Sequence, residues 1–182
     1  MKLRNLSFAS LAAVMLASCG EATKTEEVVV ETTEVVKSYN LDATNSMVNW
    51  RGQMVGGMYF HTGTLNLAKG NVTVTNGVVS GGTFEIDWNT MTATDSNYSA
   101  EQPSAYLIQH LKSADFFATD SLGAASFEIT SVEGTTLTGK LTLRGVTNVE
   151  KVTDVVVTET ENGVEATGKM TFDRQKYGAS YK

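Results

Sequence analysis

Histidine, serine and acidic side chains are the residues of this chain whose chemistry could support catalysis or metal binding. His61 and His110 are the only histidines, and neither has a cysteine or a second histidine at the short spacing of a zinc site. A Ser–His–acid hydrolase also needs a serine placed for attack, and no G-x-S-x-G pattern occurs in the sequence. We therefore expect no catalytic residue and no metal, with both histidines in surface or structural roles.

Aspartates and arginines offer a second kind of chemistry, the binding of ions. The aspartates lack the every-second-residue loop spacing of a calcium site, and turn or capping roles explain Asp115 and Asp120. Arg144 and Arg174 suit either the polar head of a ligand or ion pairs with these acids. No glycine-rich phosphate loop is present, so we expect no cofactor. The aspartates considered are Asp87, Asp95, Asp115, Asp120 and Asp173.

Residues 1–18 have the pattern of a signal peptide. Lys2 and Arg4 form its positive end, and the apolar run Leu6–Leu16 is shorter than the about 20 residues that span a bilayer. The segment Leu16-Ala-Ser-Cys19-Gly20 resembles the lipobox of bacterial lipoproteins, whose cysteine becomes the acylated first residue of the mature chain. An ordinary signal peptide that ends near a cysteine is the alternative. The resemblance implies lipid attachment at Cys19 and a place in the bacterial cell envelope, on the periplasmic or cell-surface side of the outer membrane.

The mature chain is strongly acidic. The net charge is −6 for the whole sequence, and loss of Lys2 and Arg4 with the leader takes it to −8. This charge argues against nucleic acid or anionic headgroups as partners. Glutamates crowd residues 19–37, which we interpret as a self-repelling tether, although the valines there leave a short added strand open. The predicted domain spans residues 38–182.

Alternating apolar residues over most of this domain predict β-strands. Residues 84–88, for example, alternate apolar and acidic side chains. Asn76-Gly77 and Asn162-Gly163 predict hairpin turns, and Lys69-Gly70 predicts a further turn. About eight strands joined by short turns indicate an all-β antiparallel sandwich or barrel. Glycines within strands favour the curved sheet of a barrel.

Tyr106–Phe127 interrupts the strands and contains the one convincing helical segment of the domain. Leu107 and Leu111 stand four residues apart on one apolar face, and Pro103 suits the first helical position. Phe116-Phe117 are expected to end the helix on apolar side chains. A lone helix in an all-β domain must cover a sheet face or close one end of a barrel.

Four segments of the domain stand out as motifs, in the order of the chain. They are Gly82-Thr-Phe-Glu-Ile-Asp87, Leu111-Lys-Ser-Ala-Asp-Phe-Phe117 with Ala125-Ser-Phe127, Gly139-Lys-Leu-Thr-Leu-Arg-Gly-Val-Thr147, and Asp173-Arg174 with Tyr177-Gly178. Together they resemble the motifs of the YceI-like family of lipocalin-like barrels, which is associated with polyisoprenoid or other lipid binding. The resemblance covers residues 38–182.

The resemblance implies an eight-stranded antiparallel barrel with one short helical insertion and an apolar lumen for a long lipid. The function expected is carriage or storage of that lipid, without enzyme activity. The alternatives are a filled barrel that serves as a structural or interaction lipoprotein, and an envelope hydrolase. The side chains expected to contact the ligand are Val48, Trp50, Phe60, Phe84, Ile86, Phe116, Phe117, Phe127, Ile129, Leu141 and Leu143.

Two features depart from the family pattern. Asn45-Ser46 stands where many members have His-Ser, so no role of that histidine is carried over. The sequence also stops at Lys182, where family members continue into a final strand. We therefore expect that strand to be missing and one edge of the barrel to be open, because its backbone groups lack a neighbour. The ligand's identity and the oligomeric state stay open.

Overall fold

The structure, a computed structural model, describes residues 34–53, 56–161 and 163–181. The predicted leader at 1–18, Cys19 and the tether as far as residue 33 lie outside the described residues, so the lipid anchor stays a prediction. The last tether residues are described, and Val36 and Lys37 already belong to a strand. In the described part of the chain, no helix has the length and apolar character needed to cross a bilayer.

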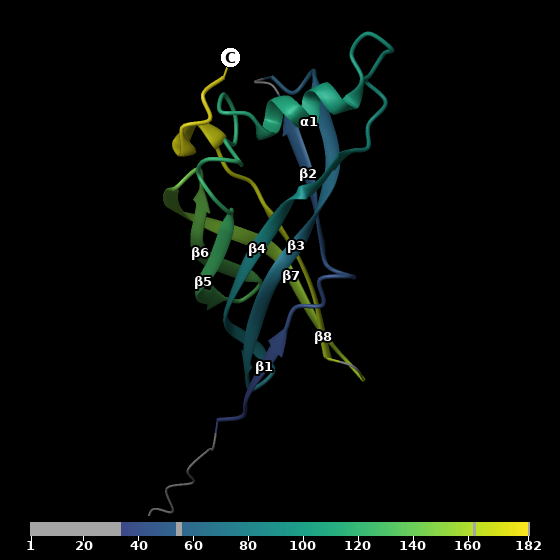
Figure 1. The fold of residues 1–182 in the computed structure, drawn as a ribbon. Coiled ribbons are helices and arrows are strands. Elements are labelled where there is room, and N and C mark those ends of the chain that lie inside the picture. Colours follow the sequence, from purple (N-terminus) through teal and green to yellow (C-terminus); the bar gives the residue numbers. More distant parts are fainter. Residues whose placement is uncertain (1–33, 54–55, 162, 182) are drawn as a thin grey trace, which may run out of the picture. The chain divides into compact units, whose positions relative to one another are not determined.

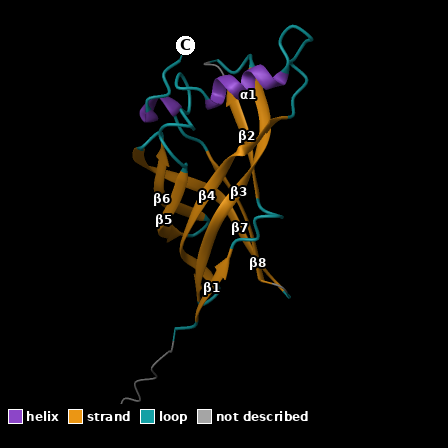
Figure 2. Ribbon diagram, viewed as in Figure 1, coloured by secondary structure: helices purple, strands orange, loops and turns teal. Residues whose placement is uncertain are grey.

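In the described part of the chain, eight strands form one antiparallel sheet, as predicted. Figure 2 shows the strands in orange. They are β1 (Val36–Asn40), β2 (Met47–Gln53), β3 (Phe60–Thr75), β4 (Val78–Ala93), β5 (Ser126–Glu133), β6 (Thr136–Leu143), β7 (Val146–Thr160) and β8 (Gly163–Met170). The order is β1-β3-β4-β5-β6-β7-β8, and β2 also pairs with β3. The all-β fold is therefore confirmed and is consistent with a lipocalin-like barrel. Among the described residues, no ladder joins β8 to β1 or β2.

Tight turns connect most neighbouring strands. Asn76 and Gly77 join β3 to β4 with φ angles of 51° and 82°, as the Asn-Gly pair predicts for a hairpin. The predicted β7–β8 hairpin is also confirmed, because Thr160 pairs with Gly163. The turn predicted at Lys69-Gly70 is wrong, since β3 continues through both residues. Gly70 instead makes room for a neighbour: a Cβ there would lie 2.8 Å from Cδ1 of Phe84.

The single α-helix among the described residues, α1 (Ser104–Lys112), lies at the end of the sheet where β2 ends (Figure 1), and it contacts β4. Pro103 is the N-cap residue and not the first helical residue, because its ψ of 155° is extended. The helix ends at Lys112, so Phe116 and Phe117 belong to the following turn and not to the helix. The Phe117 N–H still donates to the carbonyl of Leu111, at 3.0 Å, which holds this turn against the helix end.

Among the described residues, three clusters of buried apolar side chains make up the core. The first, the hairpin end, lies beside the β3–β4 turn and contains Val74, Val79, Ile129 and Leu137. The middle cluster contains Ala125, Leu141, Leu143 and Tyr177. The third, the helix-covered end, contains Leu65, Met91 and Leu111. Tyr177 comes from η1 (Arg174–Tyr177), a short 3-10 helix that Asp173 caps by accepting from the Gln175 N–H.

Candidate functional site

One face of the sheet, called the inner face below, carries the buried apolar side chains. Residues directly opposite each other in an antiparallel ladder share a face. Trp50 lies opposite Gly63, and Phe84 lies opposite Gly70. Trp50 packs against the cluster that contains Leu65, and Phe84 packs against the hairpin end. The inner face therefore continues from β2 across β3 and β4.

Three aromatic rings on this face occupy the space above glycines. A Cβ on Gly63 would lie 2.5 Å from Cζ2 of Trp50, and one on Gly139 would lie 2.4 Å from Cζ of Phe127. Phe84 covers Gly70 in the same way, as described above. A ring that lies over a glycine covers the sheet without extending far into the interior. These pairs therefore line the inner face and do not fill the space in front of it.

The same rings keep part of their surface accessible. Trp50, Phe84 and Phe127 are each partly exposed, although all three face inward. On β8, Ala166 and Gly168 share the inner face and are exposed, and they are too small to reach across it. The fully buried residues among those described are all apolar or aromatic. The inner face thus offers accessible apolar surface, which is what a long lipid requires.

At the helix-covered end, α1 and the turn after it face this surface. Leu107 and Ile108 pack with Leu111 against the cluster there. The Phe117 ring stacks on Trp88 with the centroids 5.0 Å apart, and it meets the Phe116 ring edge-on at 4.8 Å. Both phenylalanines are partly exposed. The apolar side chains expected at Phe116-Phe117 are therefore present at this end of the sheet, on the turn that follows the helix.

The structure brings together nine of the eleven predicted ligand residues. Trp50, Phe84, Ile86, Phe116, Phe117, Phe127, Ile129, Leu141 and Leu143 all belong to the three clusters or pack against them. Val48 shares their face opposite Leu65 but is 37% exposed and lies outside the clusters. Phe60 is not brought to this group. It lies on the outer face, where the Arg51 guanidinium sits 3.9 Å from its ring centroid.

His61 belongs to a polar cluster that the sequence did not predict. Its Nδ1 lies 3.2 Å from both carboxylate oxygens of Asp95 and 3.0 Å from the Tyr98 hydroxyl. Asp95 also accepts hydrogen bonds from the backbone N–H groups of Thr62 and Asn97, at 2.9 and 3.0 Å. These contacts tie the loop after β4 to the start of β3. His110 instead packs edge-on against Tyr181, with the centroids 4.4 Å apart.

The carboxyl of Asp95 is held in its ionised form. Burial raises its pKa, but hydrogen bonds from Thr62, Asn97, Tyr98 and His61 outweigh that effect and bring the pKa well below its ordinary value. Burial and the neighbouring Asp95 charge raise the pKa of Tyr98, so this phenol stays protonated and donates to the carboxylate. The cluster therefore has the chemistry of a loop anchor.

The two arginines hold the turn after α1 and the end of the described chain. Arg144 donates to the backbone carbonyls of Ala114 and Phe116, and Arg174 donates to that of Tyr181 at 2.8 Å. The Arg174 guanidinium also lies 4.7 Å from the Phe116 ring centroid. Neither arginine forms an ion pair within 4.0 Å in the part of the chain that the structure describes.

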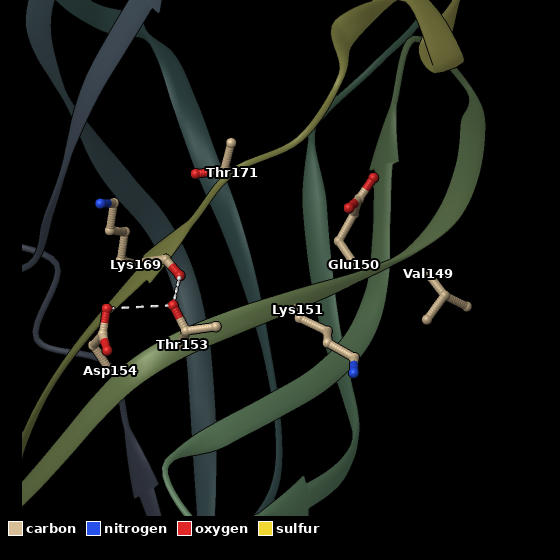
Figure 3. A pocket seen from close by; sticks show the side chains of 7 residues that line it. All are labelled: Val149, Glu150, Lys151, Thr153, Asp154, Lys169 and Thr171. Atoms are coloured by element: carbon tan, nitrogen blue, oxygen red, sulfur yellow. Dashed lines mark hydrogen bonds between the residues drawn. The ribbon is translucent and has the colours of Figure 1, made fainter.

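A hollow of about 590 Å³ lies where β8 separates from β7 (Figure 3). Its lining is largely charged and hydroxyl-bearing: Val149, Glu150, Lys151, Thr153, Asp154, Lys169 and Thr171. A second hollow of about 340 Å³ lies beside β4 and includes Ile86 and Trp88 of the inner face. The first hollow does not suit an apolar ligand, so we place the candidate site on the inner face. Among the described residues, no group of three or more potential metal ligands occurs.

Three inner-face residues are absent from the predicted set of ligand contacts. Leu65 and Met91 are buried in the cluster at the helix-covered end, and Trp88 stacks on Phe117. The alternation of side chains along a strand could have identified two of them. Leu65 is two residues from Gly63 and Trp88 is four residues from Phe84, so each shares the face of its partner. The same alternation would have excluded Phe60 from the inner face, because it is an odd number of residues, five, from Leu65. Met91 follows an irregular stretch of β4, where parity fails.

Comparison with known proteins agrees with this geometry. The sequence profile of the YceI-like domain matches residues 39–182. UPF0312 protein SAB2563 of Staphylococcus aureus (strain bovine RF122 / ET3-1) is 39% identical over 79 residues, which is 40% of this chain and 46% of that relative. UPF0312 protein SA2479 of S. aureus (strain N315) is 38% identical over 79 residues, which is again 40% of this chain and 46% of that relative. The chain thus spans about half the length of these relatives. Because the profile covers most of the sequence, the chain belongs to the YceI-like family.

Proposed function

We propose that this protein binds a long apolar ligand, a polyisoprenoid or a related lipid, against its inner face and carries or stores it. The observation that carries the proposal is the set of aromatic rings seated over glycines. Trp50, Phe84 and Phe127 face inward and keep accessible surface, which a filled core would have covered. The association of the YceI-like family with apolar ligands supports this choice of ligand class.

The binding energy comes from burial of apolar surface. Each 100 Å² of ligand surface removed from water contributes about 2.5 kcal/mol, before the costs of ordering the chain. A flexible polyprenyl chain meets only apolar and aromatic groups along the clusters, so contact area decides its affinity. The polar hollow beside β7 contributes nothing to such a chain.

The proposal includes a place in the bacterial cell envelope. Its support is the lipobox-like segment ending at Cys19 and the glutamate-rich tether at 19–37. An acylated Cys19 would hold the domain at a membrane, where lipid ligands are found, since each buried methylene contributes about 0.8 kcal/mol and two or more chains anchor stably. Exchange of lipid between the membrane and the inner face would then need no second partner.

We propose a binding protein and not an enzyme. His61 has a carboxylate partner in Asp95, as a catalytic histidine would, but the same nitrogen also contacts the Tyr98 hydroxyl. With Asp95 tied to two backbone N–H groups, the cluster is explained as an anchor for the loop before α1. Substitution of His61 by Ala should therefore leave lipid binding in place, and a hydrolytic activity that depended on His61 would contradict this assignment.

The experiment that tests the function is extraction of the purified protein with organic solvent, followed by mass spectrometry. We expect an isoprenoid or other lipid in stoichiometric amount. A preparation stripped of lipid should take up added polyprenol, and Phe127→Ala should reduce the uptake. Val156→Ala is a matched control, because Val156 is a large apolar residue that is 59% exposed and packs in none of the three clusters. Repeated absence of lipid together with no uptake would overturn the proposal.

A further inference from the structure

The indole N–H of Trp50 is a buried hydrogen-bond donor without a protein acceptor. Less than 1 Å² of its nitrogen is exposed, and none of the described residues accepts from it. It is the one buried side-chain N or O atom in the described part of the chain for which this holds. Tryptophan offers only this donor, and buried donors are nearly always satisfied. The exception therefore calls for an acceptor that is not part of the described protein.

The side chains that pack around Trp50 supply no acceptor for its N–H. The residues of the helix-covered end are aliphatic or aromatic: Leu65, Met91 and Leu111 at its centre, with Ile86, Trp88, Leu107, Ile108, Phe116 and Phe117 around them. The ring is also seated over Gly63, where a Cβ would lie 2.5 and 2.6 Å from two of its carbons. The same Cβ would lie 1.8 Å from the backbone oxygen of Thr92, so a carbonyl is near the ring but does not accept from the N–H. The seat over Gly63 holds the ring in this position.

We propose that the Trp50 N–H donates a hydrogen bond to an uncharged oxygen of the bound lipid, a hydroxyl or a carbonyl, at the helix-covered end of the inner face. This inference rests on the proposed function and adds the ligand's end group and orientation. The oxygen-bearing end lies beneath α1, and the hydrocarbon chain continues along the inner face past Phe84 and Phe127.

The number and charge of the donors favour a neutral oxygen over a phosphate. A phosphate has several strong acceptor oxygens and needs a cation or a group of donors. The members of this cluster are uncharged, and Trp50 supplies one N–H. The nearby arginines already donate to backbone carbonyls of Ala114, Phe116 and Tyr181. A single hydroxyl or carbonyl matches what the site offers.

Access to the nitrogen requires movement at this end. Because less than 1 Å² of the nitrogen is exposed, the oxygen reaches it only when neighbouring side chains shift. The parts that would have to shift are α1, which contributes Leu107, Ile108 and Leu111, and the turn that carries Phe116 and Phe117. Entry of the oxygen-bearing end is thus coupled to displacement of the helix and its turn.

The first test compares a polyprenol with an isoprenoid hydrocarbon of equal carbon number, bound to the full chain stripped of lipid. The wild type should bind the polyprenol about tenfold more tightly, the value of one hydrogen bond together with relief of an unsatisfied donor. Trp50→Phe should abolish this preference. Trp88→Phe is the matched control: it removes an inner-face indole and should weaken both ligands while keeping the preference.

The second test reads the N–H itself and does not depend on a variant that must fold. In a protein labelled with ¹⁵N-tryptophan, the Trp50 indole resonance, assigned with Trp88→Phe, should move downfield with polyprenol and stay in place with the hydrocarbon. Equal affinity for both ligands, or a preference that survives Trp50→Phe, would overturn the inference and leave an ordered water as the partner. Tighter binding of a polyprenyl phosphate than of the polyprenol would also contradict it. Failure of the wild type to bind any of these lipids would instead refute the proposed function.

Discussion

The two ends of the inner face are built differently. At the hairpin end, Val74 and Val79 are 2% and 4% exposed, and Leu137 and Ile129 complete a filled cluster. At the helix-covered end, three buried residues are surrounded by large side chains that stay partly exposed, with an unsatisfied indole N–H among them. Partly exposed side chains, Phe84 and Phe127 among them, also surround the buried centre of the hairpin end. The contrast is therefore between the buried centre of that end, which has the packing of a structural core, and the partly exposed rings, which can contact a ligand. Stability and ligand binding are therefore expected to depend on different residues.

The largest expected effect on stability is at the hairpin end. Leu137→Ala should lower the free energy of unfolding by about 2–5 kcal/mol, because it leaves a cavity in a filled cluster. Denaturant unfolding monitored by circular dichroism measures this. Lipid affinity, measured below the transition, should stay within twofold of the wild type. A large loss of lipid affinity in a folded Leu137→Ala protein would contradict the division of stability and binding between the two ends.

At the helix-covered end, Phe117→Ala should reduce lipid affinity strongly and stability less. Its ring is partly exposed and stacks on Trp88, so removing it costs less stability than Leu137→Ala does. Affinity for a polyprenol should fall by about 2 kcal/mol, roughly 30-fold, since a phenylalanine contact surface is lost. Titration calorimetry with the two variants side by side checks this. Equal affinities for the two variants would contradict the division between the ends.

Asp95→Asn should loosen the loop that leads into α1, at a cost of about 1–2 kcal/mol in unfolding free energy at neutral pH. Hydrogen bonds lower the pKa of Asp95 in the folded state, so its contribution is present above the ordinary aspartate pKa and is lost as the pH falls toward the lowered value. Wild-type stability should therefore fall in acid more steeply than that of Asp95→Asn. If the unfolding free energies of the two proteins followed parallel curves below a pH of about 4, the Asp95 carboxylate would contribute nothing to stability.

The smallest effect is expected at an ion pair beside the hairpin end. Lys37 and Glu159 approach to 3.9 Å, but both side chains are more than half exposed, at 52% and 58%. Lys37→Ala should change the unfolding free energy by less than about 0.5 kcal/mol. A loss above about 1 kcal/mol would mean that β1 depends on this contact, and that the hairpin end is held by more than its apolar cluster.

Local sequence signals predicted the strands, the hairpins and the helix, but not how glycines are used within strands. Asn76-Gly77 has the positive φ angles that its residue types predict. Lys69-Gly70 resembles a turn locally, yet Gly70 serves the approach of the Phe84 ring from the next strand. That approach depends on the register of β3 and β4, which irregularities shift at three places. Tertiary pairing therefore overrode the local turn signal.

The candidate site was predictable to the extent that side-chain alternation holds. Trp50, Phe84 and Phe127 share the inner face as expected, whereas Phe60 lies one step out of phase. The His61–Asp95 contact joins residues 34 positions apart, and only the pairing of β3 with β4 brings them together. The unsatisfied Trp50 nitrogen is likewise a property of its neighbours in space.

Photocrosslinking with a diazirine-bearing polyprenol shows which surface of the protein contacts the lipid. After cross-linking to the wild-type protein and digestion, peptide mass spectrometry locates the attached carbon. We expect labels on inner-face residues at the helix-covered end and in the middle cluster, around Trp50, Phe117 and Phe127, and none at Val74 or Leu137. Labels confined to the outer face, or to the polar hollow beside Lys169, would contradict this expectation.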